Sequence, residues 1–363
     1  MYTEIIKIIE GGIAGDKEKV YNYANVLAKN LETEGDIQFS KKIKAVLSNK
    51  RTGMTSLDNL VAKPVDIESR LDMVEITYPQ IQKADIVLSG FVEEEINDFV
   101  NCYKKRDEIL KAGLDTSNSL LLYGPPGCGK TTVAKYISSI TELPLVTARL
   151  DGMISSLLGS TAKNIRKIFD YAAKSECILF LDEFDVVAKL RDDKNELGEL
   201  KRVVNSLIQN IDSLSSNSIL IAATNHHELL DPAIWRRFSK AMCLEYPQKV
   251  EVNAMLGMLL KDIKTTFQDN EKKYEYIQNA FLGLSNSDIK TIVQNCIKIT
   301  IINERNEISN CDILREIFFY KNHSMEDEEK FIKYMLTYGV THKELNDYLN
   351  IPLRKIQKIS KGE

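Results

Sequence analysis

The chain lacks the features that would assign it to a membrane or disulfide-rich class. None of its apolar runs approaches the ~18 residues that a membrane span needs. Acidic residues interrupt the apolar start at 1–10, so we expect neither a signal peptide nor a membrane anchor. The six cysteines are widely scattered, and no pair has the spacing of a metal site. Reduced thiols in a cytoplasmic protein are the simplest interpretation.

An excess of charge of one sign is also absent. The sequence of 363 residues holds 48 lysines and arginines against 52 acids, a formal net charge of −4. This balance excludes a global basic field for nucleic acid, so any such contact must be local. The length predicts two to four structural units, at ~100–200 residues per domain.

Periodicity of the apolar residues divides the chain into regions. Near the N-terminus, Val20, Ala24, Leu27 and Leu31 recur at helical spacing, and a polar, irregular linker follows at 51–83. Next come alternating strand-like and helix-like segments, which predict an α/β unit with a parallel sheet. The remainder is helical, with no strand candidate. The predicted units are a helical module with linker (1–83), the α/β domain (84–247), a helical lid (248–323) and a C-terminal helical unit (324–363).

A phosphate-binding loop follows the first buried strand of the α/β unit. Residues 124–131 read Gly-Pro-Pro-Gly-Cys-Gly-Lys-Thr and fit G-x-x-x-x-G-K-[ST] between a strand and a helix. The glycines let backbone N–H groups face a phosphate, Lys130 can reach the β- and γ-phosphates, and the Thr131 hydroxyl can ligate Mg²⁺. We therefore predict ATP and Mg²⁺ as ligands. The expected nucleotide-binding residues are Gly124, Pro125, Pro126, Gly127, Cys128, Gly129, Lys130, Thr131, Thr132 and Asp182.

An acidic pair ends the apolar strand at 178–182. Asp182 is predicted to hold Mg²⁺ together with Thr131, because carboxylates suit this hard ion. Glu183 is predicted to orient and deprotonate the attacking water. Acids at strand ends are common, and the prediction depends on their position about fifty residues after the phosphate loop. Asp185 is interpreted as a supporting or helix-capping residue.

Two further candidates follow the strand at 219–224. The amide of Asn225 could hold the attacking water near the γ-phosphate, although asparagine at a strand end is otherwise an ordinary turn residue. Arg236 and Arg237 are consecutive and therefore point in different directions. At least one could act as an arginine finger. The alternative is a pair of surface arginines.

Together these segments resemble the AAA family of the AAA+ ATPases over about residues 84–320. The four signature segments, in family order, are Gly124–Thr131, Ile178–Asp185, Ala223–Asn225 and Leu230–Phe238, with 198–205 similar to the subunit-facing segment and Leu284–Ile289 similar to the lid-helix motif. The resemblance is to short, stand-alone bacterial members with one ATPase module. It implies a RecA-like P-loop sheet with an α-helical lid. It also implies a homo-oligomeric ring, typically a hexamer, that hydrolyses ATP to remodel a partner or client protein.

In such a ring the resemblance implies that Arg236 and Arg237 act on the ATP of the neighbouring subunit. The position that carries an aromatic in threading members falls on Leu157, beside Leu158. These leucines either grip a client or simply pack the start of a helix. The lid motif has no arginine near Ser287, as is usual for this branch. The adenine would lie against 86–88, approached from the lid by Gly283 and Ser287.

The C-terminal residues 331–363 resemble a helix-turn-helix. Thr341 and Glu344 predict a capping box, and Asn350 suits the left-handed turn before the last helix. That helix exposes Arg354, Lys355, Gln357, Lys358 and Lys361 without an intervening acid. DNA binding is one interpretation, and docking on the ring or on a partner protein is the other. Asn346 departs from the small residue usual at its position. The N-terminal helices either recruit the client or form a brace.

Overall fold

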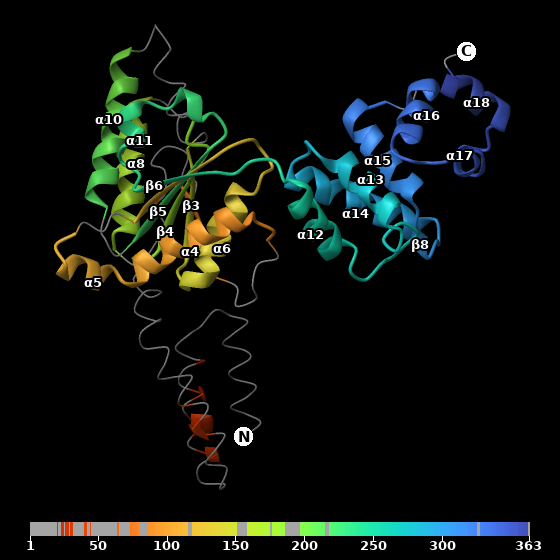
Figure 1. Ribbon diagram of the computed structural model, residues 1–363. Helices are drawn as coiled ribbons and strands as arrows, with labels where there is room; N and C mark the ends of the chain where they lie inside the picture. The colour runs from red at the N-terminus through yellow and green to blue at the C-terminus, as the bar shows by residue number, and fades with distance from the viewer. Residues whose placement is uncertain are drawn as a thin grey trace.

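The fold is taken from a computed structural model that describes most of the chain after residue 73. The described residues are 20, 23–24, 26–28, 30–31, 40–41, 44, 64, 73–79, 86–114, 118–150, 158–174, 176–185, 197–214, 218–324 and 327–361. Figure 1 shows a sheet with helices on both sides, and beside it a second body made mainly of helices. No helix among the described residues is long and apolar enough to cross a membrane.

The sheet has six strands in the order β1-β3-β4-β5-β2-β6. The strands are β1 (Val74–Thr77), β2 (Ser119–Tyr123), β3 (Leu145–Arg149), β4 (Ile178–Asp182), β5 (Ile219–Thr224) and β6 (Lys240–Cys243). All neighbours run parallel except β1 and β3, which are antiparallel. The predicted α/β class is therefore confirmed. Because β5 lies between β4 and β2, the residues that follow these three strands emerge side by side.

One part of the predicted linker is a strand, which corrects the sequence interpretation. Val74–Thr77 lies within 51–83 and pairs with β3, with Val74 opposite Ala148. Only Val74 of its four residues is fully buried, and Glu75 is exposed. An edge strand with one neighbour needs little apolar sequence, so the pattern that marks central strands is missing.

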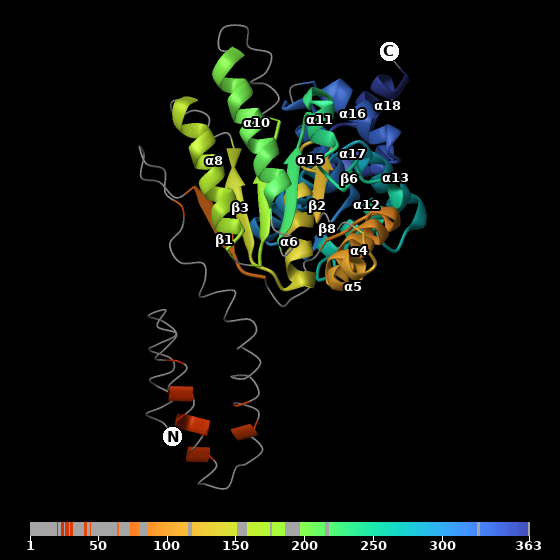
Figure 2. The same ribbon diagram turned by 90° about the vertical axis from the view of Figure 1, so that its left-hand side faces the viewer.

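Alternation along the strands gives the sheet two apolar faces. On one face Leu121, Leu179 and Leu181 pack against α8 (Leu158–Ala172) and α10 (Leu197–Ser213). On the other, Leu120, Leu122 and Phe180 pack against α4 (Gly90–Lys104) and α6 (Lys130–Thr141). Figure 2 shows α8 and α10 together beside β3, with α4 and α6 on the other side of the sheet. Successive side chains of a strand point to opposite faces, so helices on both sides bury nearly continuous apolar strands.

The second body begins directly after β6. Its helices are α12 (Lys249–Leu259), α13 (Glu271–Phe281), α14 (Asn286–Ile302), α15 (Asn310–Asn322), α16 (Glu328–Thr337), α17 (His342–Leu349) and α18 (Leu353–Lys361). Two strands of two residues each, β7 (Lys264–Thr265) and β8 (Glu307–Ile308), pair in parallel between them. The sequence predicted no strand in this region, because two residues are too few to show an alternating pattern. The shorter elements of the chain are α5 (Arg106–Lys111), η1 (His227–Leu229) and α11 (Pro232–Trp235).

The C-terminal helices share one hydrophobic core with the lid helices. Phe331 of α16 meets Phe318 of α15 edge-on, with ring centroids 5.0 Å apart. Leu345 and Ile356 are fully buried in the same cluster. The boundary at residue 324 between the lid and a separate unit stays a prediction.

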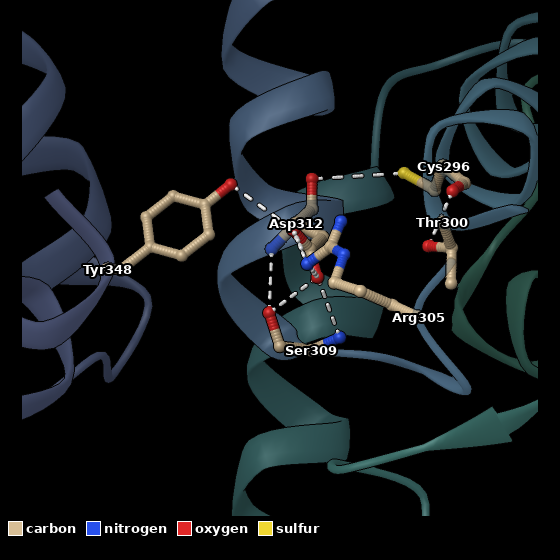
Figure 3. Close-up of polar contacts among 6 residues, drawn as sticks. All are labelled: Cys296, Thr300, Arg305, Ser309, Asp312 and Tyr348. Atoms are coloured by element: carbon tan, nitrogen blue, oxygen red, sulfur yellow. Dashed lines mark hydrogen bonds and ion pairs between the residues drawn. The ribbon is translucent and has the colours of Figure 1, made fainter. Parts of the chain in front are cut away.

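A buried carboxylate links α15 to α17 (Figure 3). Arg305 places Nη1 2.9 Å from both carboxylate oxygens of Asp312, and the Ser309 hydroxyl donates to Oδ2 at 2.7 Å. The Tyr348 hydroxyl donates to Oδ1 at 3.2 Å. Burial raises the pKa of Asp312, but the hydrogen bonds from Ser309 and Arg305 outweigh burial and hold the pKa below its usual value. The carboxylate is therefore ionised and fully engaged.

In the N-terminal region, Val20, Ala24, Leu27 and Leu31 are all helical, and Leu27 and Leu31 are buried, which confirms their predicted spacing. The Ser40 hydroxyl donates to the Ala28 carbonyl at 2.8 Å and connects a second helical segment to the first. Most of 1–72 lies outside the described residues. Its role as client recruiter or brace stays a prediction.

Candidate nucleotide-binding site

The phosphate loop curls as its glycines predict. Gly124, Gly127 and Gly129 have φ values of 136°, 76° and 94°, in the region that favours glycine. A Cβ on Gly124 would lie 2.2 Å from the backbone carbonyl oxygen of Leu244, just beyond β6. Glycine is therefore required at Gly124 both by its dihedral angle and by the close approach of the neighbouring strand.

Lys130 opens α6 and lies under this loop, with only 8% of its surface exposed. Its Nζ donates to the carbonyl oxygens of Gly124 and Pro125, both at 2.8 Å. Burial lowers the pKa of Lys130, while negative groups nearby, among them Asp182, oppose this shift. Because two neutral carbonyls do not cancel its charge, the ammonium can attract an anionic ligand to the loop.

The acidic pair is held in an unusual backbone conformation. Asp182 ends β4, and its Oδ1 accepts the N–H of Glu183 at 3.0 Å. Glu183 has a φ of 54°, which is rare for a residue with a side chain. The N–H of Phe184 donates to the Ala223 carbonyl at 2.8 Å and anchors the turn to β5. Such strain persists only where surrounding contacts impose it, and it gathers at functional sites.

Asp185, two residues further on, is only 4% exposed. The stretch 186–196 that follows it lies outside the described residues. Its predicted part as a supporting or helix-capping residue therefore stays a prediction.

Asn225 lies close to the phosphate loop. It follows β5 and lines a pocket of about 410 Å³ with Gly124 and Pro125. The other lining residues are His227, Glu228, Cys243, Glu245, Tyr246 and Gln248. The strand end in the sequence predicted Asn225. Nothing in the sequence indicated Cys243, which pairs with Tyr123 of β2 at the end of β6, or Tyr246, three residues further on.

A second pocket, of about 290 Å³, lies between the sheet body and the lid. Val87 and Leu88, from the segment predicted to lie against adenine, line it together with Cys128 of the loop and Asn286 of the lid. Gly283 is not among its lining residues, and the adenine site stays a prediction. Ser287 instead donates its N–H to the Gly127 carbonyl at 3.0 Å. The first turn of α14 thus rests on the phosphate loop.

The two arginines differ in their surroundings. Arg237 places Nε 3.2 Å from Oδ1 of Asp212 on α10, and both side chains are nearly half exposed. Such a surface pair contributes little to stability, on the order of 0–1 kcal/mol. Arg236 is exposed, and within the described part of the chain the structure shows no ion pair for its guanidinium. Neither arginine lines either pocket.

The oxygen donors at this site fit a magnesium ion that arrives with a nucleotide. Thr131 is exposed beside Lys130, and Asp182 is half-buried at the end of β4. In the described residues, no three His, Cys, Asp or Glu side chains gather into a metal site of their own. Magnesium commonly takes one or two protein oxygens and completes its shell with phosphate oxygens and water. The donor set therefore suits Mg²⁺ with phosphate rather than an independent metal centre.

Comparison with known proteins agrees with this geometry. A family model described as "ATPase family associated with various cellular activities (AAA)" matches residues 120–246. The chain is 35% identical over 314 residues to the uncharacterized AAA family ATPase y4kL of Sinorhizobium fredii, an alignment that covers 86% of this chain and 90% of that protein. The chain belongs to the AAA family of ATPases. Family membership supports nucleotide binding and ATP hydrolysis in general.

This AAA ATPase is also similar to longer proteins. It is 28% identical over 309 residues to the peroxisomal ATPase pex6 of Schizosaccharomyces pombe, with 77% of this chain and 32% of that protein covered. It is 27% identical over 284 residues to the ATP-dependent zinc metalloprotease FtsH 2 of Bdellovibrio bacteriovorus, with 73% and 45% covered. The chain thus spans less than half the length of these two relatives.

Leu157 lies outside the described residues of the AAA ATPase. Leu158 is the first residue of α8, and its side chain also lies outside the description. The choice between gripping a client and packing a helix stays open. Residues 198–205, which resemble the subunit-facing segment of the family, fall within α10.

Proposed function

We propose that this AAA ATPase assembles into a ring, typically a hexamer, and hydrolyses ATP with Mg²⁺ to remodel a partner or client protein. The observation that supports this proposal best is the arrangement around β5. The strands β4, β5 and β2 are adjacent; Asp182 ends β4, Asn225 follows β5, and Lys130 opens the helix α6 after the phosphate loop that follows β2. The first turn of the lid helix α14 contacts this loop.

Each side chain has a chemical task in this proposal. The loop N–H groups and Lys130 bind the phosphates, and Thr131 and Asp182 hold Mg²⁺, which offsets phosphate charge. Glu183 accepts a proton from the attacking water, whose oxygen bonds to the γ-phosphorus while the bond to the β-phosphate oxygen breaks. The products are ADP and phosphate, and Glu183 returns its proton to solvent. Asn225 would position the water.

Arg236 is the better candidate for the arginine finger. Arg237 is engaged with Asp212 on its own subunit, whereas Arg236 has no such ion pair among the described residues. Because neither arginine lines either of the two pockets described above, we infer that Arg236 acts on the ATP of the neighbouring subunit. A cation that stabilises transition-state charge in this way is worth about 10³–10⁵ in rate.

The proposed work on a protein draws on the relatives and the lid. FtsH 2 is an ATP-dependent metalloprotease, so in that protein ATP use accompanies action on a protein. In this chain the contact of Ser287 with Gly127 gives nucleotide at the loop a direct route to move the lid. Stimulation of hydrolysis by an unfolded protein, lost in Leu157→Ala, would support threading through a pore.

A mixing experiment tests the shared site. Glu183→Gln chains keep the finger but lack the catalytic base, and Arg236→Ala chains keep the base but lack the finger. Each variant alone should hydrolyse ATP poorly. Mixed assemblies should recover activity, because at some subunit interfaces the intact Glu183 of one chain faces the intact Arg236 of its neighbour. The matched control, Arg237→Ala mixed with Glu183→Gln, should show no gain beyond what dilution of each variant predicts.

Two outcomes would contradict the proposal. Full turnover by dilute monomer would show that the site is complete within one chain. Failure of the Arg236→Ala and Glu183→Gln mixture to recover activity, while both variants still assemble and bind ATP, would show that Arg236 does not serve a neighbour.

A further inference from the structure

The last three helices form a helix-turn-helix whose turn is held by a side chain. Asn350 connects α17 to α18 with a φ of 55°, the left-handed value that asparagine tolerates. The Asn346 side chain donates through Nδ2 to the Ile351 carbonyl at 2.8 Å. Asn346, which departs from the usual small residue, therefore fixes the turn. The Thr341 and Glu344 capping box fixes the start of α17, as predicted.

This unit is fastened to the lid and cannot turn freely. Lys273 of α13 places Nζ 2.6 Å from Oε1 of Glu344, and Tyr348 donates to the buried Asp312. The Tyr276 ring lies so close to Gly339 that a Cβ there would be 2.4 Å from it. These contacts and the shared apolar core hold α18 in one orientation. Figure 1 shows α18 at the outer end of the helical body, away from the sheet.

The outward face of α18 is a cationic stripe formed by Arg354, Gln357, Lys358 and Lys361. These four residues recur at i, i+3, i+4 and i+7, so they share one face of the helix. All four are exposed, while Ile356 on the opposite face is fully buried. No acid occurs between Leu353 and Lys361. The stripe thus presents three cations and one amide to solvent.

Ion pairs with described residues do not neutralise the three cations of the stripe. Lys355, beside it, forms an ion pair with Glu328 at 2.6 Å. The structure shows no such pair for Arg354, Lys358 or Lys361 with any described residue. In a chain with a net charge of −4, a local excess of three cations on one rigid helix is a distinct surface feature.

We propose that the cationic stripe of α18 binds duplex DNA in the major groove. The groove is about 12 Å wide and admits an α-helix. Arg354 and Gln357 lie towards the N-terminal part of α18, where recognition helices meet base edges. Lys358 and Lys361 follow towards its end and contact phosphates. Leu353, 42% exposed at the start of α18, offers apolar contact to a thymine methyl group.

The expected affinity of one unit is low and depends on salt. With Lys358 and Lys361 on phosphates, the slope of log affinity against log salt should be about −1.8. Affinity should then fall about 12-fold between 50 and 200 mM salt. Several copies in the proposed ring would add avidity. The contact itself needs neither the ring nor hydrolysis.

Binding of the full chain to a fluorescent mixed-sequence duplex, followed by anisotropy at low salt, tests this proposal. The variant Arg354→Ala/Lys358→Ala/Lys361→Ala should lose at least tenfold in affinity and most of the salt slope. The control Lys261→Ala/Lys264→Ala/Lys272→Ala removes the same charge from exposed lid positions and should stay within twofold of wild type. Both triple variants should melt like wild type, because all six positions are exposed and surface substitutions usually change stability by less than about 0.5 kcal/mol each.

Three results would overturn the proposal. The first is absence of DNA binding by the wild-type chain at low salt. The second is an equal loss in both triple variants, which would assign binding to overall charge. The third is capture of an acidic polypeptide through the stripe with no competition from DNA. The Lys130→Ala chain should keep its DNA affinity, so failure of the ATPase proposal would leave this one testable.

Discussion

The carboxylate of Asp312 in the lid and that of Glu183 at the sheet edge are held in opposite ways. Asp312 is 6% exposed and accepts hydrogen bonds from Arg305, Ser309 and Tyr348. Glu183 is exposed and sits on a left-handed backbone, which costs about 1–3 kcal/mol. Asp312 lies in a helix with its oxygens hydrogen-bonded and buried, and Glu183 lies in left-handed backbone with an exposed side chain.

This difference separates residues that stabilise the fold from residues available for chemistry. A fully hydrogen-bonded buried carboxylate stabilises the packing of the helices around it. The left-handed turn at Glu183 is held by the bond from the Phe184 N–H to the Ala223 carbonyl, and the proposed function assigns this residue to catalysis. Among the described residues, the ammonium of Lys130 donates to two carbonyls of its own loop and forms no ion pair with a carboxylate.

The largest expected effect is on hydrolysis. Glu183→Gln should lower the ATP turnover rate by about 10²–10⁴, because the amide cannot accept the proton of water. Steady-state phosphate release measures the rate, and calorimetry measures ATP binding, which should persist. The midpoint of urea unfolding should move little. Loss of ATP binding in this variant would contradict the assignment of Glu183 as base.

The matching change in the lid should affect stability instead. Asp312→Asn should lower the free energy of unfolding by about 2–3 kcal/mol, since Arg305 and the two hydroxyl donors lose an ionised acceptor. Urea unfolding measures the loss. Asp347→Asn, an exposed change on α17, should stay within about 0.5 kcal/mol of wild type. If Asp312→Asn changed the free energy of unfolding as little as Asp347→Asn, the hydrogen bonds of Asp312 would not stabilise the lid as proposed.

A smaller effect should appear where the two bodies touch. Gly127→Ala and Gly129→Ala both place a side chain at a left-handed position. Only the Cβ at Gly127 meets an obstacle, the Ser285 Oγ at 2.4 Å, whereas nothing lies within 4 Å at Gly129. Without nucleotide, Gly127→Ala should therefore be less stable than Gly129→Ala by about 1–2 kcal/mol. Equal unfolding midpoints would mean that the lid does not rest on the loop in solution.

The smallest expected effect is the pH dependence of the stability that Asp312 contributes. The pKa of Asp312 is lower in the folded chain than in the unfolded chain, so its contribution is complete above the unfolded value of about 3.9. It disappears as the pH falls through the folded pKa. The stability difference between wild type and Asp312→Asn should be constant from pH 7 to about 5 and should shrink below about pH 4. A difference unchanged at low pH would show that charge is not involved.

The sequence predicted the parts that local chemistry specifies. The loop glycines, Lys130 and the acid pair follow from motifs and spacing, because backbone curvature and strand ends leave local traces. Interactions between segments that are distant in the sequence leave no such local pattern. The ion pair of Arg237 with Asp212 joins residues whose neighbourhood depends on how α10 packs.

The same limit explains other differences. Val74–Thr77 was expected in a linker, because an edge strand needs only one buried position. The sequence did not indicate Asn286 as a lining residue of the pocket at Val87 and Leu88, since its place depends on how the lid sits on the loop. Asn346 looked unsuitable for a helix-turn-helix until its bond to the Ile351 carbonyl gave it a role.

The connection from β6 to α12 has a mechanical consequence. Glu245, Tyr246 and Gln248 border both pockets, and the same short stretch is the covalent link between the sheet body and the lid. A ligand in these pockets would therefore press on the pivot as well as on the parts that swing about it. Binding of a ligand in these pockets would therefore be coupled to the angle between the lid and the sheet body. Release of the ligand would then accompany a change in the conformation of this connection.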